Sequence, residues 1–454
     1  MAKQKRDFTL GNPGNQLLVF AFPLIISMVL QNLYNTADVV IVGRFVGESA
    51  LAAVGTSSTL MRVMLMLVTG ATQGMSVIIS QFYGANDEEG VKKTITTSFF
   101  LIIGISLVLS VLGAVYSRQL LEMIKVPADV LEDATAYLRI ILAGTLVTAL
   151  YNMANFVSRS LGDSVTPTIV LVITSILNVG FNLMFVLIFN LGVVGVAYGT
   201  VLATAISAVV CWVIVWHKMP IVRPDSGTIK ADPEIVKMVT KIGIPSALQS
   251  STVSIGALLV QSFVNVFGST VMAAYGAATK IEALVSYPPG GITQAMQVFT
   301  GQNVGAGKFE RVKQGFKSGL KIIAIYSVIS ASIMVFGGRT LMSIFSKEAG
   351  EMLSIGHIYL AISGVGVFFC GLLFMARSTL IGAGDAAAGV YISSVELVVR
   401  IVGAYILSKH TSLGYVGVFL ATPIAWIVAG LYGYYRYKKG QWQEKRLVED
   451  VVTA

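Results

Sequence analysis

The sequence predicts an all-α integral membrane protein with twelve transmembrane helices, arranged as two pseudo-symmetric six-helix lobes around a central cavity. Three observations lead to this fold class. Of the 454 residues, 55% are hydrophobic and only 12% are charged, whereas soluble domains are about 25% charged. The chain holds twelve long apolar segments, and its two halves resemble each other in sequence.

Each apolar segment is long enough for a transmembrane helix, which needs about 20 mostly apolar residues. The segments are rich in glycine and lack the roughly 10-residue alternating pattern of barrel strands. The predicted spans lie at about residues 15–42, 50–80, 94–116, 131–158, 166–189, 193–216, 236–266, 271–300, 316–338, 352–380, 386–408 and 413–436.

The basic residues predict the orientation of the chain. If the N-terminus is cytoplasmic, 22 of the 32 Lys and Arg residues lie in the inner segments and 6 in the outer ones. The positive-inside rule therefore predicts a multi-pass protein of the cell membrane with both termini in the cytoplasm. Because topology explains the net charge of +9, no nucleic-acid partner is expected.

An internal repeat divides the chain. The stretch QGMSVIISQFYGAN (73–86) resembles QAMQVFTGQNVGAG (294–307) at an offset of 221 residues, and Pro23 corresponds to Pro245. An even number of helices per half makes the repeats parallel, which favours a transporter that works by alternating access. A channel built on a duplicated fold is the alternative. The predicted domains are an N-terminal lobe (1–216), a cytoplasmic linker (217–235) and a C-terminal lobe (236–454).

A polar stripe interrupts the first apolar segment. Gln31, Asn35 and Asp38 recur at i, i+4 and i+7, on one face of a helix. A carboxylate in a transmembrane helix costs about 2.5–3.5 kcal/mol, so this face should point into the lobe. Burial favours the protonated acid, which makes Asp38 the candidate to load and release a proton. A hydrogen-bonded structural acid is the alternative.

The sequence lacks the residue patterns that metal binding, enzyme catalysis and ATP hydrolysis require. The three His are scattered and the two Cys lie in apolar segments, so neither a metal site nor an enzyme is expected. No GxxxxGK[ST] motif for ATP is present, and no cofactor is expected. A flippase for a lipid-linked precursor would need a strongly cationic cavity, and only four basic residues lie within the predicted helices.

Several motifs together resemble one transporter family. VVIVGRFVGESALAAVG, SQFYGANDEEGVKK, SRSLGDSVTP and TKIEALVSYPPGGITQAMQVFTGQNVGAGKFERV are similar to the multidrug and toxic compound extrusion (MATE) family over about residues 10–440. The DinF-like bacterial branch resembles the chain more than the NorM-like branch does, because the helix at 236–266 lacks that branch's acid. The resemblance implies a monomeric secondary antiporter that exports organic cations and lipophilic drugs in exchange for protons. Sodium coupling, and a flippase for a lipid-linked precursor, remain the alternatives.

The resemblance also implies a coupling site. Similar proteins place a polar cluster beside the Asp of the first helix, and Asn178 and Thr200 match its pattern. Asn182 stands where a second carboxylate is expected, which favours protons, although Na⁺ at this cluster remains open. Interhelical hydrogen bonding is the alternative role for both Asn residues. In similar transporters the first helix bends when its Asp is protonated, so Pro23 is the predicted hinge, since proline permits a kink.

A drug site should be apolar, with a few polar groups and aromatic rings that hold cations. Adaptable Met side chains suit varied ligands, although packing is the alternative role for each such residue. Glu396 and Arg400 form an i, i+4 pair that we expect to be structural. Apart from drugs and the coupling ion, membrane lipids are the expected partners. The candidate drug-binding residues are Gln31, Tyr34, Asn35, Tyr151, Asn152, Asn155, Tyr275, Glu282, Tyr287, Gln294 and Met296.

Overall fold

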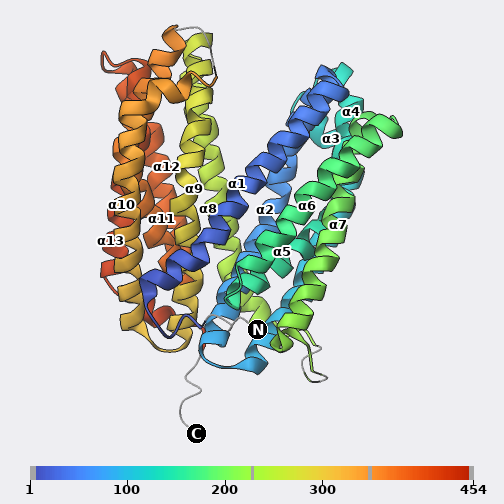
Figure 1. Cartoon of the computed structure of the whole chain (residues 1–454), viewed down its shortest axis with the longest axis vertical. Helices are drawn as coiled ribbons and strands as arrows, with labels where there is room; N and C mark the ends of the chain where they lie inside the picture. Colours follow the sequence, from blue (N-terminus) through green and yellow to red (C-terminus); the bar gives the residue numbers. More distant parts are fainter. Residues whose placement is uncertain (1–6, 226, 228–229, 346–349, 449–454) are drawn as a thin grey trace. The chain divides into compact units, whose positions relative to one another are not determined.

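The computed structural model describes residues 7–225, 227, 230–345 and 350–448, and these are almost wholly helical (Figure 1), which confirms the all-α membrane fold. The described helices are α1 (Pro13–Phe45), α2 (Glu48–Gly84), α3 (Glu88–Met123), α4 (Ala128–Ala143), α5 (Thr145–Ser160), α6 (Val165–Leu183), α7 (Gly192–Lys218), α8 (Pro233–Asn265), α9 (Ser269–Gly305), α10 (Phe309–Met342), α11 (Glu351–Gly382), α12 (Ala386–Lys409) and α13 (Tyr415–Lys438). Three short turns of other helix types complete the order: η1 (Met184–Ile188), η2 (Pro220–Val222) and η3 (Gln441–Lys445).

Within the described residues, ten helices are long and apolar enough to cross a membrane, and a bent pair makes an eleventh span. That pair is α4 and α5, which meet at Gly144 with a bend of 47°. A Cβ atom at residue 144 would lie 2.7 Å from the Val201 side chain of α7. The span predicted at 131–158 is therefore a broken one. The span predicted at 271–300 lies in α9, which is not among the ten.

Prolines lie inside several helices without ending them. α1 continues through Pro23, α8 through Pro245 and α13 through Pro423. Proline removes one backbone hydrogen bond and its ring crowds the preceding turn. Sharp kinks in long helices occur at such residues, so α1, α8 and α13 each contain one position where bending is favoured.

The contacts of the chain divide it into two compact units. The described part of unit 1 is Asp7 with the described residues of Ile26–Ala247, and that of unit 2 is Phe8–Ile25 with the described residues from Leu248 onward. Both α1 and α8 are therefore shared between the units, with the division two residues after Pro23 and Pro245. The domain boundaries drawn at the linker from the sequence stay a prediction.

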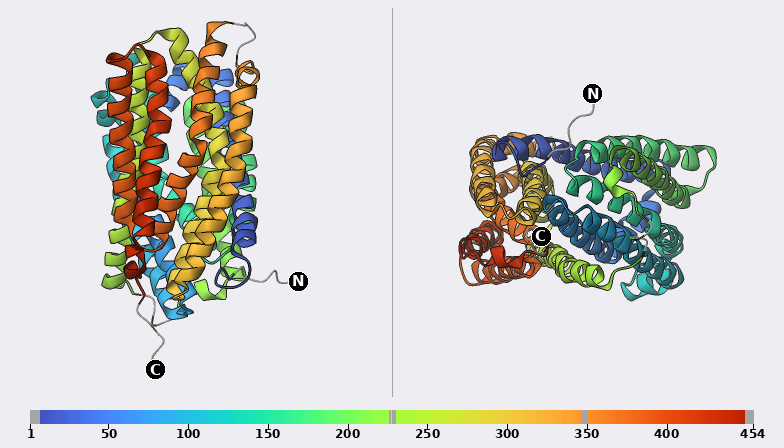
Figure 2. Two further views of the ribbon diagram at one scale, coloured as in Figure 1. Left: turned by 90° about the vertical axis from the view of Figure 1, so that its left-hand side faces the viewer. Right: turned by 90° about the horizontal axis from the view of Figure 1, so that it is seen from below.

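Each unit has its own apolar core. In unit 2, Leu17 and Phe20 of α1 are fully buried with Phe299 of α9 and Leu373 of α11. In unit 1, α2, α3, α5 and α7 pack through a separate cluster around the fully buried Met75. Figure 2 shows α12 and α13 of unit 2, in orange and red, running side by side. Large exposed apolar side chains along α3, such as Val108, Val111, Leu112 and Val115, fit a lipid-facing surface.

Candidate functional site

The first-helix carboxylate lies at one end of a chain of hydrogen bonds inside unit 1. Asn182 of α6 donates from Nδ2 to Asp38 Oδ1 at 2.7 Å, and the same nitrogen donates to Asn178 Oδ1 at 3.0 Å. Asn178 in turn donates to Thr200 Oγ1 of α7 at 3.1 Å. The structure thus brings together the four residues that the sequence proposed as a coupling cluster, from α1, α6 and α7.

The local structure explains why the two amides lie together and one of them meets the carboxylate. Asn178 and Asn182 are one turn apart on α6, and both are fully buried. Gly199 of α7 makes this placement sterically possible, since a Cβ atom there would lie only 2.1 Å from Asn182 Oδ1. Asn182 Oδ1 accepts no hydrogen bond in the described structure. The cluster therefore keeps one acceptor oxygen without a donor, and this oxygen lies against Gly199.

Two tyrosines surround this cluster. The Tyr34 hydroxyl, one turn before Asp38 on α1, hydrogen-bonds with Thr200. Tyr137 of α4 is buried and lies near enough to Asp38 to feel its charge. Sequence reasoning missed Tyr137, because a single Tyr in an apolar helix matches no motif. The groups described around the half-buried carboxylate are neutral and polar, and Asn182 is its hydrogen-bond donor.

The rest of the polar stripe on α1 does not join the chain of hydrogen bonds. Gln31 and Asn35 are exposed on α1, whereas Asp38 is half-buried. Pro23, the predicted hinge, is half-buried and lies in the part of α1 that belongs to unit 2. In this stripe, Asp38 is therefore hydrogen-bonded within unit 1, whereas the side chains of Gln31 and Asn35 are exposed.

A second polar group lies along α5 in the same unit. Tyr151 hydrogen-bonds with Asn155 and with Thr174 of α6, and Thr174 donates to Ser207 Oγ of α7 at 2.7 Å. Asn155 is buried and accepts a long contact of 3.9 Å from the Cys211 thiol. Two of the three proposed drug contacts on α5, Tyr151 and Asn155, thus interact with groups inside the unit.

In unit 2 the structure brings two of the proposed drug contacts together around a third residue. Tyr359 of α11 donates its hydroxyl to Glu282 Oε2 of α9. Tyr275 packs edge-on against Tyr359, with ring centroids 5.1 Å apart. The phenol Tyr359 is a functional candidate that sequence reasoning missed, because it lies about 80 residues from its partner and no spacing rule connects them.

The other candidates in unit 2 are dispersed. Met296 is fully buried in the apolar core of the unit, where it packs. Tyr287 and Gln294 are half-buried on the same helix, α9. Asn152, on α5 of unit 1, is likewise half-buried. Their roles in drug binding stay predictions.

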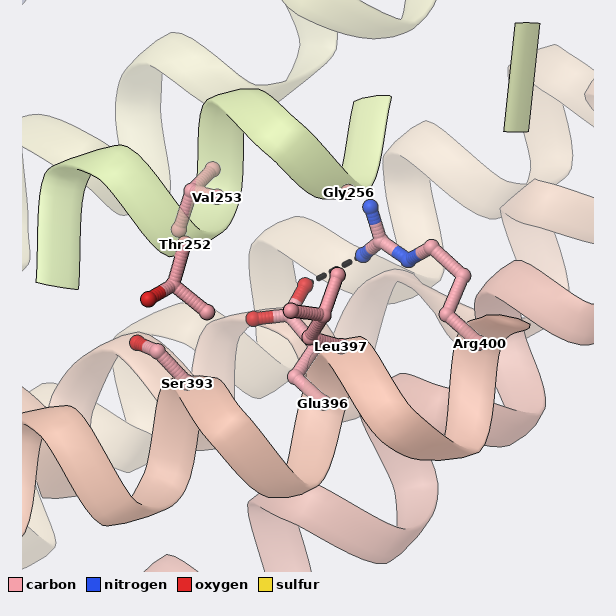
Figure 3. Close-up of a pocket in the computed structure, with 7 residues that line it drawn as sticks. All are labelled: Thr252, Val253, Gly256, Ser393, Glu396, Leu397 and Arg400. Atoms are coloured by element: carbon pink, nitrogen blue, oxygen red, sulfur yellow. Dashed lines mark hydrogen bonds and ion pairs between the residues drawn. The ribbon is translucent and has the colours of Figure 1, made fainter. Parts of the chain in front are cut away.

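The i, i+4 pair on α12 forms a buried ion pair, Arg400 with Glu396. Figure 3 shows the pair at a small cleft between α8 and α12, with Thr252 and Ser393 close by. The described residues contain no group of three or more His, Cys, Asp or Glu that could hold a metal ion. The carboxylate of this cleft is neutralised by its own helix, unlike that of Asp38.

Comparisons with known proteins agree on one family. A family model described as MatE matches residues 23–184 and again residues 245–406. The Probable multidrug resistance protein YoeA of Bacillus subtilis (strain 168) is 29% identical over 441 residues, covering 95% of each chain. A crystal structure of MATE in the bent conformation matches with a TM-score of 0.90 at 24% identity, covering 98% of this chain and 99% of that one. A crystal structure of MATE in the straight conformation matches with a TM-score of 0.89 at 23% identity, covering 98% and 100%.

Proposed function

This chain belongs to the MatE family of multidrug and toxic compound extrusion transporters, and we propose that it exports organic cations and lipophilic drugs in exchange for protons. It is a multi-pass membrane transporter and not an enzyme. In the proposed cycle, two lobes alternate the access of one drug site between the cytoplasm and the outside. Asp38 is the carboxylate that couples this cycle to the proton gradient.

One observation carries the proposal: the hydrogen bond of 2.7 Å from Asn182 to Asp38. When Asp38 is ionised, this bond is charge-assisted and about twice as strong as a neutral one. Protonation removes the charge and weakens the attraction between α1 and α6. A proton arriving from outside would thus loosen the Asp38 part of α1 from α6 and α7.

When this part of α1 is released from α6 and α7, the helix can bend. Pro23 lies fifteen residues before Asp38 in the same helix, and a proline is where a long helix bends. Similar MATE structures are described as bent and straight, and we propose that in this chain the first helix bends. Bending would expel the drug outward, and release of the proton inside would reset the carrier.

Coupling requires that drug and proton favour different states of the transporter. Tyr34 offers a direct connection, because its hydroxyl hydrogen-bonds with Thr200 of the coupling cluster. A drug that displaces Tyr34 would change the same hydrogen-bond chain that binds Asp38. Gln31 and Asn35, exposed beside Tyr34 on α1, are the further drug contacts that we propose on this helix.

Sodium is the second candidate for the coupling ion, favoured by the acceptor oxygen of Asn182 that receives no hydrogen bond in the described structure. Na⁺ takes oxygen ligands, and the oxygens of Asp38, Asn182 and Thr200 are of that type. Only one of these residues carries a negative charge, which binds a cation less firmly than two carboxylates. We therefore propose protons as the coupling ion.

The test is ethidium transport by the purified protein in liposomes, with a proton gradient or a sodium gradient imposed separately. Asp38→Asn removes the charge at constant shape, and Asp129→Asn, at the exposed start of α4, is the matched control. We expect the proton gradient alone to drive transport in the unmodified protein and in Asp129→Asn, and transport at least tenfold slower in Asp38→Asn.

Two outcomes contradict the proposal. Transport driven by sodium alone would make the Asn178, Asn182 and Thr200 oxygens the cation ligands. Transport by neither gradient, with the protein shown to be folded, would reject drug export. Movement of a lipid-linked precursor would then be the next activity to measure.

A further inference from the structure

One arginine binds the segment that leads into α1. The Arg311 guanidinium of α10 donates to three backbone carbonyls of this segment: Phe8 O at 2.8 Å, Leu10 O at 2.5 Å and Gly11 O at 2.8 Å. It also donates to Gln16 Oε1, within the first turn of α1, at 2.8 Å. One side chain thus holds four acceptors spread over nine residues.

The same segment is anchored by a buried aromatic ring. Phe8 is fully buried, with its ring edge-on to Phe20 of α1 at 5.0 Å and to Phe299 of α9 at 5.8 Å. Both polar groups of its backbone have partners on α9. The Phe8 amide donates to Gln302 Oε1 at 3.2 Å, and the Phe8 carbonyl accepts from Asn303 Nδ2 at 3.1 Å. Gln302 and Asn303 are fully buried, so this contact is part of the core of unit 2.

These contacts explain how the chain divides. Phe8–Ile25 belongs to unit 2, whereas α1 from Ile26 onward, including Asp38, belongs to unit 1. The division lies two residues beyond Pro23, at the part of α1 where a kink is favoured. We propose that Arg311 is a positioning residue that fixes the start of α1 to α9 and α10, so that bending at Pro23 moves the Asp38 half of the helix.

The lengths show why a fixed start matters. Asp38 is fifteen residues beyond Pro23, which is about 22 Å along a helix at 1.5 Å per residue. A bend of about 20° at Pro23 would displace Asp38 by about 8 Å if the other end is fixed. If the N-terminal end of α1 could move, it would absorb part of the bend, and Asp38 would be displaced less. This proposal rests on the function proposed above, because it concerns how a proton on Asp38 acts on α1.

The geometry calls for arginine at this position. Arg presents five N–H donors in a planar, rigid arrangement, whereas Lys presents three donors on one nitrogen at the end of a flexible chain. The four acceptors of Arg311 are reached from Nε, Nη1 and Nη2. Lysine would reach only some of them, so Arg311→Lys is expected to give a partial loss.

The first experiment compares three variants in liposomes. Arg311→Ala removes the clamp, by which we mean the four hydrogen bonds from Arg311 to the start of α1. Arg311→Lys keeps the charge. Lys313→Ala is the control, since Lys313 is exposed on the same helix and pairs only with Glu310 among the described residues. We expect proton-driven ethidium transport at least tenfold slower in Arg311→Ala and intermediate in Arg311→Lys. Ethidium Kd should stay within twofold of the unmodified protein, and Lys313→Ala should transport normally.

The second experiment replaces the clamp by a covalent bond. A Cβ atom at Gly14 would lie 3.4 Å from Ser318 Cβ of α10, close to the separation of about 3.8 Å in disulfides. Gly14→Cys with Ser318→Cys, in a background with Cys211→Ala and Cys370→Ala, should therefore crosslink the start of α1 to α10 on oxidation. We expect the oxidised protein to transport normally, and the crosslink to restore Arg311→Ala to within twofold.

The outcomes separate a positioning role from a merely structural one. Thermal unfolding of each variant before oxidation shows whether it is folded, because a disulfide also stabilises a protein with a folding defect. Recovery of transport on oxidation supports a positioning role only for a variant that is already folded. If oxidation stops transport while Arg311 is intact, the start of α1 must leave α10 during the cycle, and the proposal is overturned. Normal transport by Arg311→Ala would overturn it as well.

Failure of the proposed function is distinguishable from failure of the clamp. If the unmodified protein moves no ethidium under either gradient, the proposed function fails while the clamp remains testable by amide hydrogen exchange. The Phe8 amide should exchange slowly in the unmodified protein and at least tenfold faster in Arg311→Ala. Equal exchange in the two proteins would refute the clamp by itself.

Discussion

Gly199→Ala tests the Asn182–Asp38 hydrogen bond without replacing either of these two residues. The added Cβ atom would lie 2.1 Å from Asn182 Oδ1, 3.0 Å from the Asn182 backbone nitrogen and 3.2 Å from its Cγ. The amide must withdraw by about 1 Å to reach an ordinary separation. A donor–acceptor distance of 2.7 Å that grows by about 1 Å is no longer a hydrogen bond.

The expected effect follows from the strength of that bond. A hydrogen bond to a charged group contributes about 1.5–3 kcal/mol, and each 1.36 kcal/mol is about tenfold in a rate. We therefore expect proton-driven ethidium transport in liposomes to fall about ten- to a hundredfold in Gly199→Ala. Thermal unfolding of the purified protein reports whether the variant is folded.

Gly180→Ala is the matched control on α6, because a Cβ atom there meets nothing within 4 Å. Alanine is the better helix former by about 1 kcal/mol, so the control should be at least as stable as the unmodified protein and equally active. The reasoning is refuted if Gly199→Ala, folded and inserted, transports as fast as Gly180→Ala.

Three further substitutions test other parts of the account. Asn182→Asp supplies a second carboxylate beside Asp38, and ethidium transport should then respond to a sodium gradient; an unchanged response to protons alone would contradict this. Pro23→Ala restores a helical hydrogen bond and should slow transport several-fold while raising the melting temperature, whereas unaltered transport would argue against a hinge there. Tyr359→Phe leaves the half-buried Glu282 without its hydroxyl donor and should destabilise the protein by about 1–3 kcal/mol in a thermal-unfolding assay; an unchanged melting temperature would count against that contact.

The family resemblance placed Asn178, Asn182 and Thr200 beside Asp38, where the structure has them, and their role in coupling stays a prediction. Only one part of the arrangement follows a local rule. Asn178 and Asn182 are one turn apart on a helix, so they share a face whatever the tertiary structure. Gly199 and Tyr137 could not be predicted in this way. The role of Gly199 depends on how closely α7 approaches α6, and Tyr137 reaches Asp38 only through the packing of α4.

The bend between α4 and α5 and the division of α1 between the two units could not be predicted from the sequence either. Hydropathy alone predicts residues 131–158 as one span, because it does not detect the bend at Gly144, where α7 approaches so closely that a Cβ atom would lie 2.7 Å from the Val201 side chain. Phe8 and Arg311, which contact each other within unit 2, are about 300 residues apart in the chain. Such pairs follow no periodicity, so only the three-dimensional structure brings them together.

The central claim is that a proton on Asp38 and a bound drug exclude each other, and proton release on drug binding tests it most directly. Ethidium is added to the purified protein in weakly buffered solution, and the pH change is recorded. Linkage requires that a drug which disfavours the protonated state releases the proton. The account predicts release of up to about one proton per drug bound by the unmodified protein, and none by Asp38→Asn at saturating drug. Equal release by both proteins would contradict it.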